Sequence, residues 1–394
     1  MLNIGEIINL ITNGSLTLIA LIVIGLLLDQ GGFSQGVALH LAYLGKQNGR
    51  LLWVIVVIFA ALITAIFGNY ITILIFLPIV LEMGIMLKFA PTGMFAFVMS
   101  VGFIADVASL SLPISNMNNI YITELLQISF WRYILVMIPV NLMTAIACIG
   151  VLWFYFVPYI PVKYKLKELP QPSSVIKDQI MFNWRWVFFG LLLLGNLTCQ
   201  ILAIPVFLAA GFAVWLLIGI TGRFFNSQKK QIIDFDDLLE NVPVQIVIYS
   251  ILMYILGAAL TNIGLGKFFS YNLNKLSDLG ITNISNIVGF GAMLLSSITN
   301  NIPGILISGI SIRDAIGIDS ITKEVMIYAS LIGANIGSKI IPTASIGTLL
   351  WMNILHNKGI KIKWAKYIKM SLVLTLPVLL VTLMSLTLWL PWLV

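Results

Sequence analysis

The sequence predicts an all-α polytopic membrane protein that contains two repeats of opposite orientation. Its composition is the first observation: apolar residues make up 60% of the 394 residues and charged residues only 9%, whereas a soluble domain is about one quarter charged. The second observation is a polar stretch that occurs twice. The third is a series of apolar runs long enough to span a bilayer, among them Leu16–Leu28, Leu51–Phe67, Ile134–Val157, about Trp186–Ala203, Pro205–Thr221 and Ser371–Leu390.

The repeated polar stretch contains hydroxyl, amide and charged side chains around a proline. Its first copy is Gly102–Asn119 and its second is Gly333–Ser345. A lipid-facing helix does not carry so many polar groups, because each unsatisfied group costs several kcal/mol in hydrocarbon. Both copies are therefore expected to line a water-filled cavity or to pack against protein. Alignment of the prolines pairs four positions: Pro113 with Pro342, Ala105 with Ala334, Asp106 with Asn335, and Ser109 with Ser338.

Further landmarks keep the same order around both copies. A polar break precedes each copy, at Phe67–Tyr70 and at Thr299–Pro303. An aromatic–basic group follows each copy, at Trp131–Tyr133 and at Trp364–Tyr367. Apolar segments that are broken at matching positions of two halves indicate the binding site of a secondary transporter.

Basic loops predict the orientation of the two repeats. Lys163, Lys165 and Lys167 lie in one loop, and five lysines lie in the loop Asn357–Lys369, so both loops are expected on the cytoplasmic side. The apolar segment after Trp131–Tyr133 runs toward the basic loop that contains Lys163. The apolar segment after Trp364–Tyr367 instead starts from the basic loop Asn357–Lys369. The repeats are therefore expected to be inverted. The predicted parts are a first inverted repeat over residues 1–157, a cytoplasmic linker loop over 158–185 and a second inverted repeat over 186–394.

The breaks and the polar copies, placed together near the membrane midplane, would form one pocket. Amides, hydroxyls and helix N-termini could hold an anion or a hydroxylated neutral solute there, although such amides can also merely cap broken helices. The charges are Asp106 and Lys339, which we assign to ion coupling because charges inside a membrane are costly; a structural ion pair between them is the alternative. The candidate solute-binding residues are Asn69, Ser109, Ser115, Asn116, Asn300, Asn301, Asn335, Ser338, Thr343 and Ser345.

Several other kinds of chemistry find no support in the sequence. Cys148 and Cys199 lie in separate apolar runs and give neither a metal spacing nor a disulfide framework. No Gly-x-x-x-x-Gly-Lys-Ser/Thr sequence is present, so an ion gradient or a separate ATPase would supply the energy. The net charge of +7 comes from lysines between apolar runs, which is a topology signal rather than a nucleic-acid signal. We expect no cofactor, no metal site and no enzymatic activity.

The sequence resembles the arsenical pump membrane subunit family, the arsenite/antimonite permeases of the ion-transporter superfamily. The resemblance implies that superfamily's fold, with broken helices and re-entrant hairpins in two inverted repeats. It also implies export of arsenite or antimonite across the bacterial inner membrane in exchange for protons, with a soluble ATPase docked in some members. The resemblance extends from about Ile4 to Leu390 and is strongest in five blocks: Gly102–Leu110, Ser115–Asn116, Ser297–Pro303, Gly337–Ile340 and Pro342–Trp351.

Two stretches depart from the pattern of that family. The family has Asn-Asp-Gly after the first break, where this chain has Asn69–Ile71. The family also has an acid at the position of Asn335, and a proline at the position of Ser338. Two candidate proton-carrying carboxylates are thus neutral here, and Asp106 is the acid that the mirrored stretches retain.

Three other functions compete with export of arsenite. A sodium-coupled carrier of an anion such as a dicarboxylate could use the same fold, with amides and carbonyls at the breaks. A relative with altered or lost transport is allowed by the missing carboxylates. A polytopic membrane enzyme would need a cluster of histidines, cysteines or acids at one membrane face, and the sequence shows none.

Labelling of introduced cysteines tests the predicted topology. Lys163→Cys and Lys366→Cys, each made in a variant that lacks Cys148 and Cys199, should not react with a membrane-impermeant thiol reagent added to intact cells, because both loops are cytoplasmic. Both should react after permeabilisation, which serves as the control. Labelling of either site from outside would contradict the topology.

Overall fold

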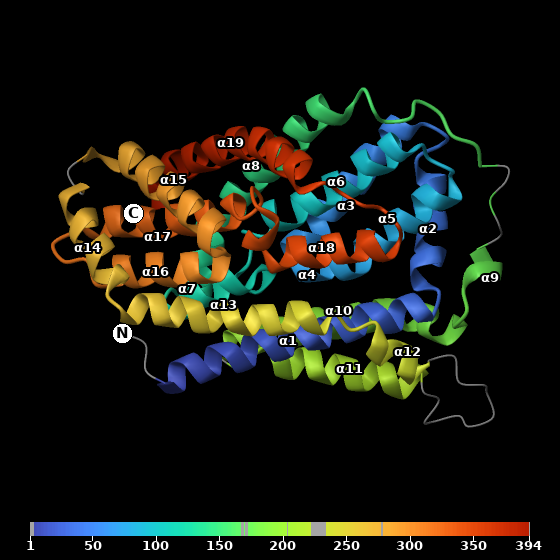
Figure 1. Ribbon diagram of the computed structural model, residues 1–394, viewed down its shortest axis with the longest axis horizontal. Coiled ribbons are helices and arrows are strands. Elements are labelled where there is room, and N and C mark those ends of the chain that lie inside the picture. Colours follow the sequence, from blue (N-terminus) through green and yellow to red (C-terminus); the bar gives the residue numbers. More distant parts are fainter. Residues whose placement is uncertain are drawn as a thin grey trace. The chain divides into compact units, whose positions relative to one another are not determined.

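The computed structural model describes residues 4–166, 169, 172–202, 204–221, 234–276 and 279–393, and each of the regular elements in these residues is a helix (Figure 1). The predicted all-helical class is confirmed. The predicted loop lysine Lys167 lies outside the described residues.

The helices of the first part of the chain are α1 (Ile4–Gln30), α2 (Phe33–Leu44), α3 (Gly49–Phe67), α4 (Asn69–Ile71), the π-helix η1 (Thr72–Phe76), α5 (Leu77–Met86), α6 (Pro91–Val107), the 3₁₀-helix η2 (Pro113–Ser115), α7 (Met117–Leu125) and α8 (Phe130–Phe156). The next are α9 (Pro172–Val175), α10 (Gln179–Ile201), α11 (Phe207–Thr221) and α12 (Phe235–Glu240). The last are α13 (Val244–Asn262), α14 (Leu265–Leu276), α15 (Ile281–Thr299), α16 (Asn301–Arg313), α17 (Ser320–Gly337), the 3₁₀-helix η4 (Pro342–Ala344), α18 (Ile346–Asn357), α19 (Trp364–Trp389) and the 3₁₀-helix η5 (Leu390–Leu393).

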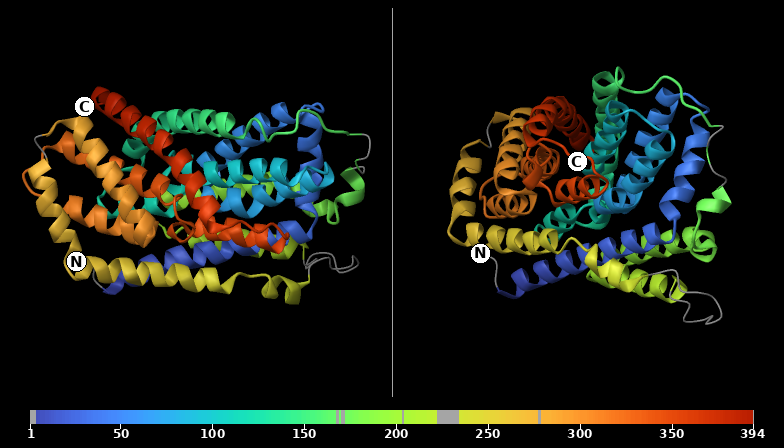
Figure 2. Two further views of the ribbon diagram at one scale, coloured as in Figure 1. Left: turned by 45° about the horizontal axis from the view of Figure 1, so that its top comes forward. Right: turned by 45° about the vertical axis from the view of Figure 1, so that its right-hand side comes forward.

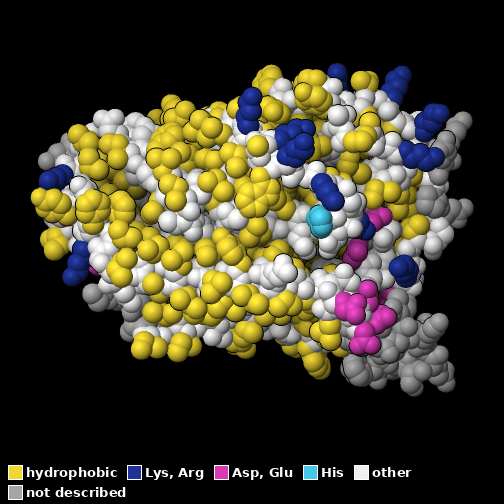
Figure 3. All heavy atoms as spheres, viewed as in Figure 1, with side chains coloured by type: hydrophobic (Ala, Val, Ile, Leu, Met, Phe, Trp, Pro, Cys, Tyr) yellow, Lys and Arg dark blue, Asp and Glu magenta, His cyan; other side chains and the backbone are white. Residues whose placement is uncertain are grey.

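Eight helical segments of the described residues are long and apolar enough to cross a membrane. Hydrophobic side chains cover most of the visible surface, and charged side chains are confined to a few groups on it (Figure 3). The eight segments are Ile4–Gln30, Gly49–Phe67, Asn69–Met86, Phe130–Phe156, Gln179–Ile201, Val244–Asn262, Ile281–Thr299 and Trp364–Leu393.

Two helices differ from the predicted spans. Helix α10 begins at Gln179 rather than near Trp186, because the Asp178 carboxylate caps it by accepting hydrogen bonds from the N–H groups of Ile180 and Met181. Helix α11, predicted as a span over Pro205–Thr221, has only 15 helical residues. That length is below the roughly 17 residues that a span needs.

The chain folds into two compact units. Unit 1 comprises Met1–Thr12, Asp106–Val151 and Gln245–Val394, and unit 2 comprises Asn13–Ala105 and Leu152–Val244. Each unit contains segments from before and after the predicted linker. The two compact units therefore do not coincide with the two predicted repeats.

The two predicted polar breaks share one unusual backbone conformation. Helices α3 and α15 both have 19 residues. Gly68 caps the end of α3, with φ 97° and ψ 168°, and Asn300 caps the end of α15, with φ 100° and ψ 155°. Glycine adopts this region readily, whereas a residue with a Cβ is strained by about 1–3 kcal/mol. Asn300 therefore occupies a position where glycine would be the ordinary choice.

The two proline stretches also share a local structure. After α6 and after α17 the chain makes a short turn, then a 3₁₀-helix, and then starts a new helix. Asn116 caps α7 by accepting a hydrogen bond from the N–H of Asn118, at 3.1 Å. Ser345 caps α18 by accepting one from the N–H of Thr348, at 3.3 Å. Each cap satisfies a backbone donor that a broken helix would otherwise leave unpaired inside the protein.

The core of unit 1 forms where α17 packs closely against α15. A Cβ added at Gly333 would lie 2.0 Å from the Gly289 carbonyl oxygen, so only glycine fits there. The Ser296 and Ser297 hydroxyls of α15 donate to the carbonyls of Ala334 and Gly337, both at 2.8 Å. This packing fixes the last turns of α17, which carry the second polar copy.

Substitutions at Asn300 test the strained break. Asn300→Ala should lower the free energy of unfolding by about 2 kcal/mol, because the positive φ remains while the side-chain hydrogen bonds to Ile302 N–H and to the Thr343 carbonyl are lost. Asn300→Gly loses the same bonds but relieves about 1–3 kcal/mol of strain, so it should remain close to the parent. Thermal unfolding in detergent measures both.

Glycines supply the controls for this comparison. Gly68→Ala, at φ 97°, should be destabilising, whereas Gly150→Ala should be neutral or slightly stabilising because an added Cβ meets nothing within 4 Å. If Asn300→Gly and Asn300→Ala lowered the free energy of unfolding equally, backbone strain at Asn300 would be contradicted.

Candidate functional site

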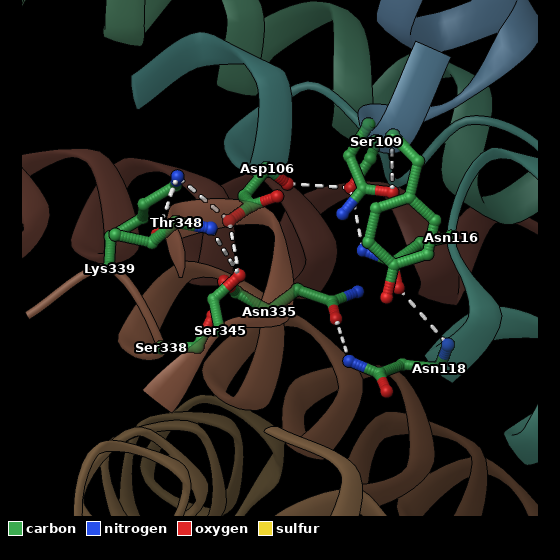
Figure 4. Close-up of polar contacts among 11 residues, drawn as sticks. Asp106, Ser109, Asn116, Asn118, Asn335, Ser338, Lys339, Ser345 and Thr348 are labelled. Atoms are coloured by element: carbon green, nitrogen blue, oxygen red, sulfur yellow. Dashed lines mark hydrogen bonds and ion pairs between the residues drawn. The ribbon is translucent and has the colours of Figure 1, made fainter. Parts of the chain in front are cut away.

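A buried ion pair joins the two polar copies within unit 1. Asp106 lies in the last turn of α6, and Lys339 lies directly after α17. The Lys339 Nζ is 2.8 Å from Asp106 Oδ2, and each side chain is 2% exposed (Figure 4). The Ser345 hydroxyl donates to the same carboxylate oxygen at 2.8 Å, and Lys339 Nζ also donates to Thr348 Oγ1 at 3.0 Å. Both charges therefore have an opposite charge and a hydroxyl partner.

The stability of this buried ion pair depends on the presence of both charges and of their hydrogen-bond partners. Removing two charges from water costs several kcal/mol per ion, and close pairing with further hydrogen bonds offsets that cost. Loss of either charge would leave the other buried and uncompensated, which is much less favourable than the intact pair. The pair is thus stable in its present geometry, but a change in the charge of either partner should displace the other.

An uncharged group occupies the equivalent position of the other copy. Asn335, which aligns with Asp106, accepts a hydrogen bond from the Asn118 amide at 2.6 Å and donates one to Asn119 Oδ1 at 2.9 Å. Its side chain points toward Asn118, which lies at the start of α7 (Figure 4). The contacts are therefore reciprocal: the end of α6 meets the start of α18, and the end of α17 meets the start of α7.

Several predicted solute-binding hydroxyls hold the chain at the two breaks. Ser109 donates to the Asp106 carbonyl at 2.6 Å, and Ser338 donates to the Asn335 carbonyl at 2.8 Å. Ser115 donates to the Ser109 carbonyl at 2.6 Å, and the Asn116 amide donates to Ser109 Oγ at 3.0 Å. These bonds satisfy carbonyls that the helix ends leave without intrahelical partners.

The break between α15 and α16 contacts the second copy. The Asn300 amide and the Tyr249 hydroxyl both donate to the Thr343 carbonyl, at 2.8 Å. Asn301 is 6% exposed, and its Oδ1 has no hydrogen-bond partner among the described residues. Buried amide oxygens usually have a hydrogen-bond partner, so Asn301 keeps an unused acceptor at this break.

One predicted residue belongs to the other compact unit. Asn69 is buried at the start of α4, where its Oδ1 accepts from the N–H of Tyr70 at 2.9 Å. It belongs to unit 2, so its place in the same pocket stays a prediction. The other nine predicted solute-binding residues, together with Asp106 and Lys339, all belong to unit 1.

Sequence reasoning missed three members of the site. They are Asn118 and Asn119, which contact Asn335, and Thr348, which contacts Lys339. The alignment of the prolines contained the signal, because it pairs Asn119 with Thr348, three residues beyond the aligned helix caps. Extension of the alignment into the following helices would have identified Asn119 and Thr348, but not Asn118, which aligns with Gly347.

A second ion pair also lay outside the predicted site. Arg132, in the first aromatic–basic group, makes two hydrogen bonds to the Glu324 carboxylate, at 2.8 and 2.7 Å. A third N–H of Arg132 donates to the Leu393 carbonyl at 3.1 Å. This partly exposed group links α8, α17 and η5 within unit 1, and its bidentate geometry is typical of a strong arginine–carboxylate contact.

Helices long enough to span a bilayer, combined with buried polar breaks in such helices, define a multi-pass membrane protein of the transporter class. The model of the family described as arsenical pump membrane protein matches residues 2–390. An arsenical pump membrane protein of Escherichia coli is 40% identical over 382 residues, which are 96% of this chain and 87% of that protein. Proteins of the same name from Yersinia enterocolitica and Shigella flexneri are 39% and 38% identical, with the same coverage. The chain therefore belongs to the arsenical pump membrane protein family, which confirms the resemblance in its sequence.

A double-mutant cycle tests the buried pair. Asp106→Asn and Lys339→Met should each lower the free energy of unfolding by about 3–5 kcal/mol, because each leaves one charge unpaired. The double variant should lose clearly less than the sum of the two, since it leaves no unpaired charge. Denaturation of the purified protein in detergent measures all three.

A partly exposed pair supplies the control for the cycle. Arg313 and Asp314 form an ion pair at 3.0 Å with side chains that are 35% exposed, so Arg313→Gln should cost no more than about 1 kcal/mol. Additive losses for Asp106 and Lys339 would contradict an energetic coupling between them.

Proposed function

We propose that the protein exports arsenite or antimonite across the bacterial inner membrane in exchange for protons. The buried ion pair between Asp106 and Lys339, formed between two helix breaks, carries this proposal. Membership of the arsenical pump membrane protein family supports an arsenical substrate. A buried carboxylate in a polar site inside the membrane can take up or release a proton, and the binding of a solute next to it can be linked to that change of charge.

The proposed solute is the neutral trihydroxy form of trivalent arsenic or antimony. Thiolates are the soft ligands that would hold such an ion tightly, but Cys148 and Cys199 are single cysteines on different helices, α8 and α10. No group of three or more histidines, cysteines or acids suited to a metal ion occurs among the described residues. Hydrogen bonds from amides and hydroxyls around Asn301, Asn335 and Ser345 would bind the hydroxyls of the solute and also release it readily.

Alternating access around these breaks is the proposed transport mechanism. We infer that residues 1–157 and 186–394 are inverted repeats, joined by a cytoplasmic linker. Four structural correspondences support this inference: the 19-residue helices α3 and α15, the positive φ of Gly68 and Asn300, the 3₁₀-helices η2 and η4, and the capped starts of α7 and α18. Inverted repeats with broken helices at the midplane are the usual architecture of secondary transporters.

The chemistry of the pair supports proton coupling. Protonation of the Asp106 carboxylate would remove its charge and leave Lys339 without its counter-ion. The ammonium would then have to move toward another acceptor or toward water, and this movement would open the contact between α6 and α18. Asn335 carries no titratable proton, so the equivalent contact between α17 and α7 would stay neutral through the cycle.

A sodium-coupled anion carrier is the second candidate. The oxygens of Asp106, Ser345 and Thr348 are of the kind that a hard cation binds, and this arrangement supports the alternative. In the structure, however, the Lys339 ammonium lies 2.8 Å and 3.0 Å from two of these oxygens. The position of a mobile cation is thus taken by a tethered one, which favours a proton over sodium as the coupling ion.

Gradient-driven uptake into reconstituted vesicles tests the proposed function. Arsenite uptake by the parent protein should follow an imposed pH gradient and should not follow a sodium gradient. Asp106→Asn should reduce uptake driven by the pH gradient at least about tenfold, a typical size for a coupling between two sites. Asp314→Asn, which removes a partly exposed acid outside the proposed site, serves as the matched control.

Each other outcome has a separate meaning. Uptake driven by sodium, or uptake of a dicarboxylate in place of arsenite, would favour the second candidate. Uptake that requires ATP and an added soluble ATPase would show primary pumping with a partner. Unchanged pH-driven uptake in Asp106→Asn would make Asp106 a structural residue, and no uptake under any condition would indicate a relative that has lost transport.

A further inference from the structure

Unit 2 contains a large apolar cavity that the proposed transport does not use. Its volume is about 590 Å³, and helices α2, α3, α10 and the continuous segment α4–η1–α5 form its walls. This volume is within the range of sites that bind drug-sized molecules. All of its lining residues lie in unit 2. Six phenylalanines dominate the lining: Phe33, Phe59, Phe67, Phe76, Phe182 and Phe189.

Two basic side chains lie at this otherwise apolar wall. Arg185 and His40 both line the cavity, and none of the described lining residues is acidic. The Arg185 guanidinium lies 4.1 Å from the centre of the Phe182 ring, and its Nη1 donates to the Phe182 carbonyl. The His40 ring is stacked with the same phenylalanine, with its centroid 6.3 Å from that of Phe182. Both basic side chains therefore lie near one phenylalanine at the cavity wall.

Arg185 and His40 both retain capacity for hydrogen bonds to a lipid headgroup. A guanidinium has five N–H donors in a planar arrangement that suits phosphate, and the contact with the Phe182 carbonyl uses one nitrogen of Arg185. His40 Nδ1 lies 2.7 Å from the Gly36 carbonyl oxygen, to which it donates its proton, so Nε2 of the neutral ring is an acceptor. A phosphate group could therefore accept hydrogen bonds from Arg185, and a headgroup hydroxyl could donate to His40, while an apolar chain enters the cavity.

The cavity lies where a membrane surface is expected. Helix α2 runs across the axes of α1 and α10 rather than along them (Figures 1 and 2). Trp184 and Trp186 are 50% and 74% exposed, and tryptophans are enriched at membrane interfaces. The loop after α2 pairs with the linker through an antiparallel bridge between Asn48 and Lys163. With the linker on the cytoplasmic side, as proposed above, the cavity lies at the leaflet that carries anionic lipids.

We propose that this cavity is a binding site for an anionic phospholipid. An acyl chain packs against the phenylalanines, the phosphate of the headgroup contacts Arg185, and a headgroup hydroxyl donates to His40. A soluble anion alone would leave the apolar walls without a partner, whereas a zwitterionic lipid would place its own cation near Arg185. Basic pockets between membrane helices on the cytoplasmic side select anionic headgroups for the same electrostatic reason.

Two variants separate the roles of the acyl chain and the headgroup. A Cβ added at Gly190, a lining residue on α10, meets no heavy atom within 4 Å, so Gly190→Leu should fill the cavity without disturbing the fold. Gly211→Leu is its matched control, because Gly211 also has open space around it but does not line the cavity. Arg185→Gln removes the proposed phosphate contact, and Arg50→Gln removes an exposed charge that does not line the cavity.

Binding of lipid to the purified full-length chain tests the proposal. Native mass spectrometry and thermal unfolding are recorded in detergent with phosphatidylglycerol, with phosphatidylcholine of the same acyl chains, and with inorganic phosphate. The parent and both control variants should bind phosphatidylglycerol in preference to phosphatidylcholine and gain thermal stability from it. Gly190→Leu should lose binding of both lipids at this site, and Arg185→Gln should reduce the preference roughly fivefold, the size expected for one basic side chain at a membrane surface.

Three results would overturn the proposal. Equal binding of the two phospholipids by the parent would show an ordinary lipid-facing groove. Stabilisation by inorganic phosphate alone would show an anion site without a lipid. Unchanged lipid binding in Gly190→Leu, with a folded protein, would place the bound lipid elsewhere.

Discussion

The ion pair between Asp106 and Lys339 sets the constraint that the surrounding part of unit 1 satisfies. Two charges with almost no exposed surface are stable only when other groups fix their positions and complete their hydrogen bonds. Ser345 and Thr348, at the start of α18, supply those bonds. The breaks after α6 and α17 are equally necessary. If either helix continued, Asp106 and Lys339 would not both reach the first turn of α18.

The two equivalent positions differ in charge although their local structures correspond. Asp106 contacts the cap of α18, whereas Asn335 contacts the amides at the start of α7. A carboxylate can gain or lose a proton, but an amide cannot. The proposed mechanism therefore places the titratable step at one of two related contacts and keeps the other as a fixed polar contact that a solute can share.

Much of the fold was predictable from the sequence because hydrocarbon imposes strict rules. Apolar runs predicted the long helices, and the breaks at Gly68 and Asn300 are at the predicted positions. The start of α10 was not predicted, because the cap at Asp178 is a local hydrogen bond inside a basic, proline-rich loop. The compact units were also not predictable, since contacts between distant segments, such as α8 with α19, are not visible in periodicity or composition.

Prediction of the site was less complete, for a different reason. Residue type and alignment brought Asp106, Lys339 and Ser345 into one proposed pocket, and the structure places them in direct contact. The same reasoning could not separate a hydroxyl that binds a solute from one that satisfies a carbonyl at a helix end, as Ser109 and Ser338 do. It also left Asn119 and Thr348 out of the candidate residues, although the alignment of the prolines pairs these two positions.

Solute-linked proton exchange by the purified protein tests the central claim most directly. Arsenite is mixed with the protein in weakly buffered detergent solution, and a pH-indicator dye records the protons that are released or taken up. If binding of solute and of a proton are linked through the ion pair, the parent should show a pH change that saturates with arsenite, because linkage is reciprocal. Asp106→Asn should bind arsenite without that change. An equal proton exchange in Asp106→Asn would contradict the account.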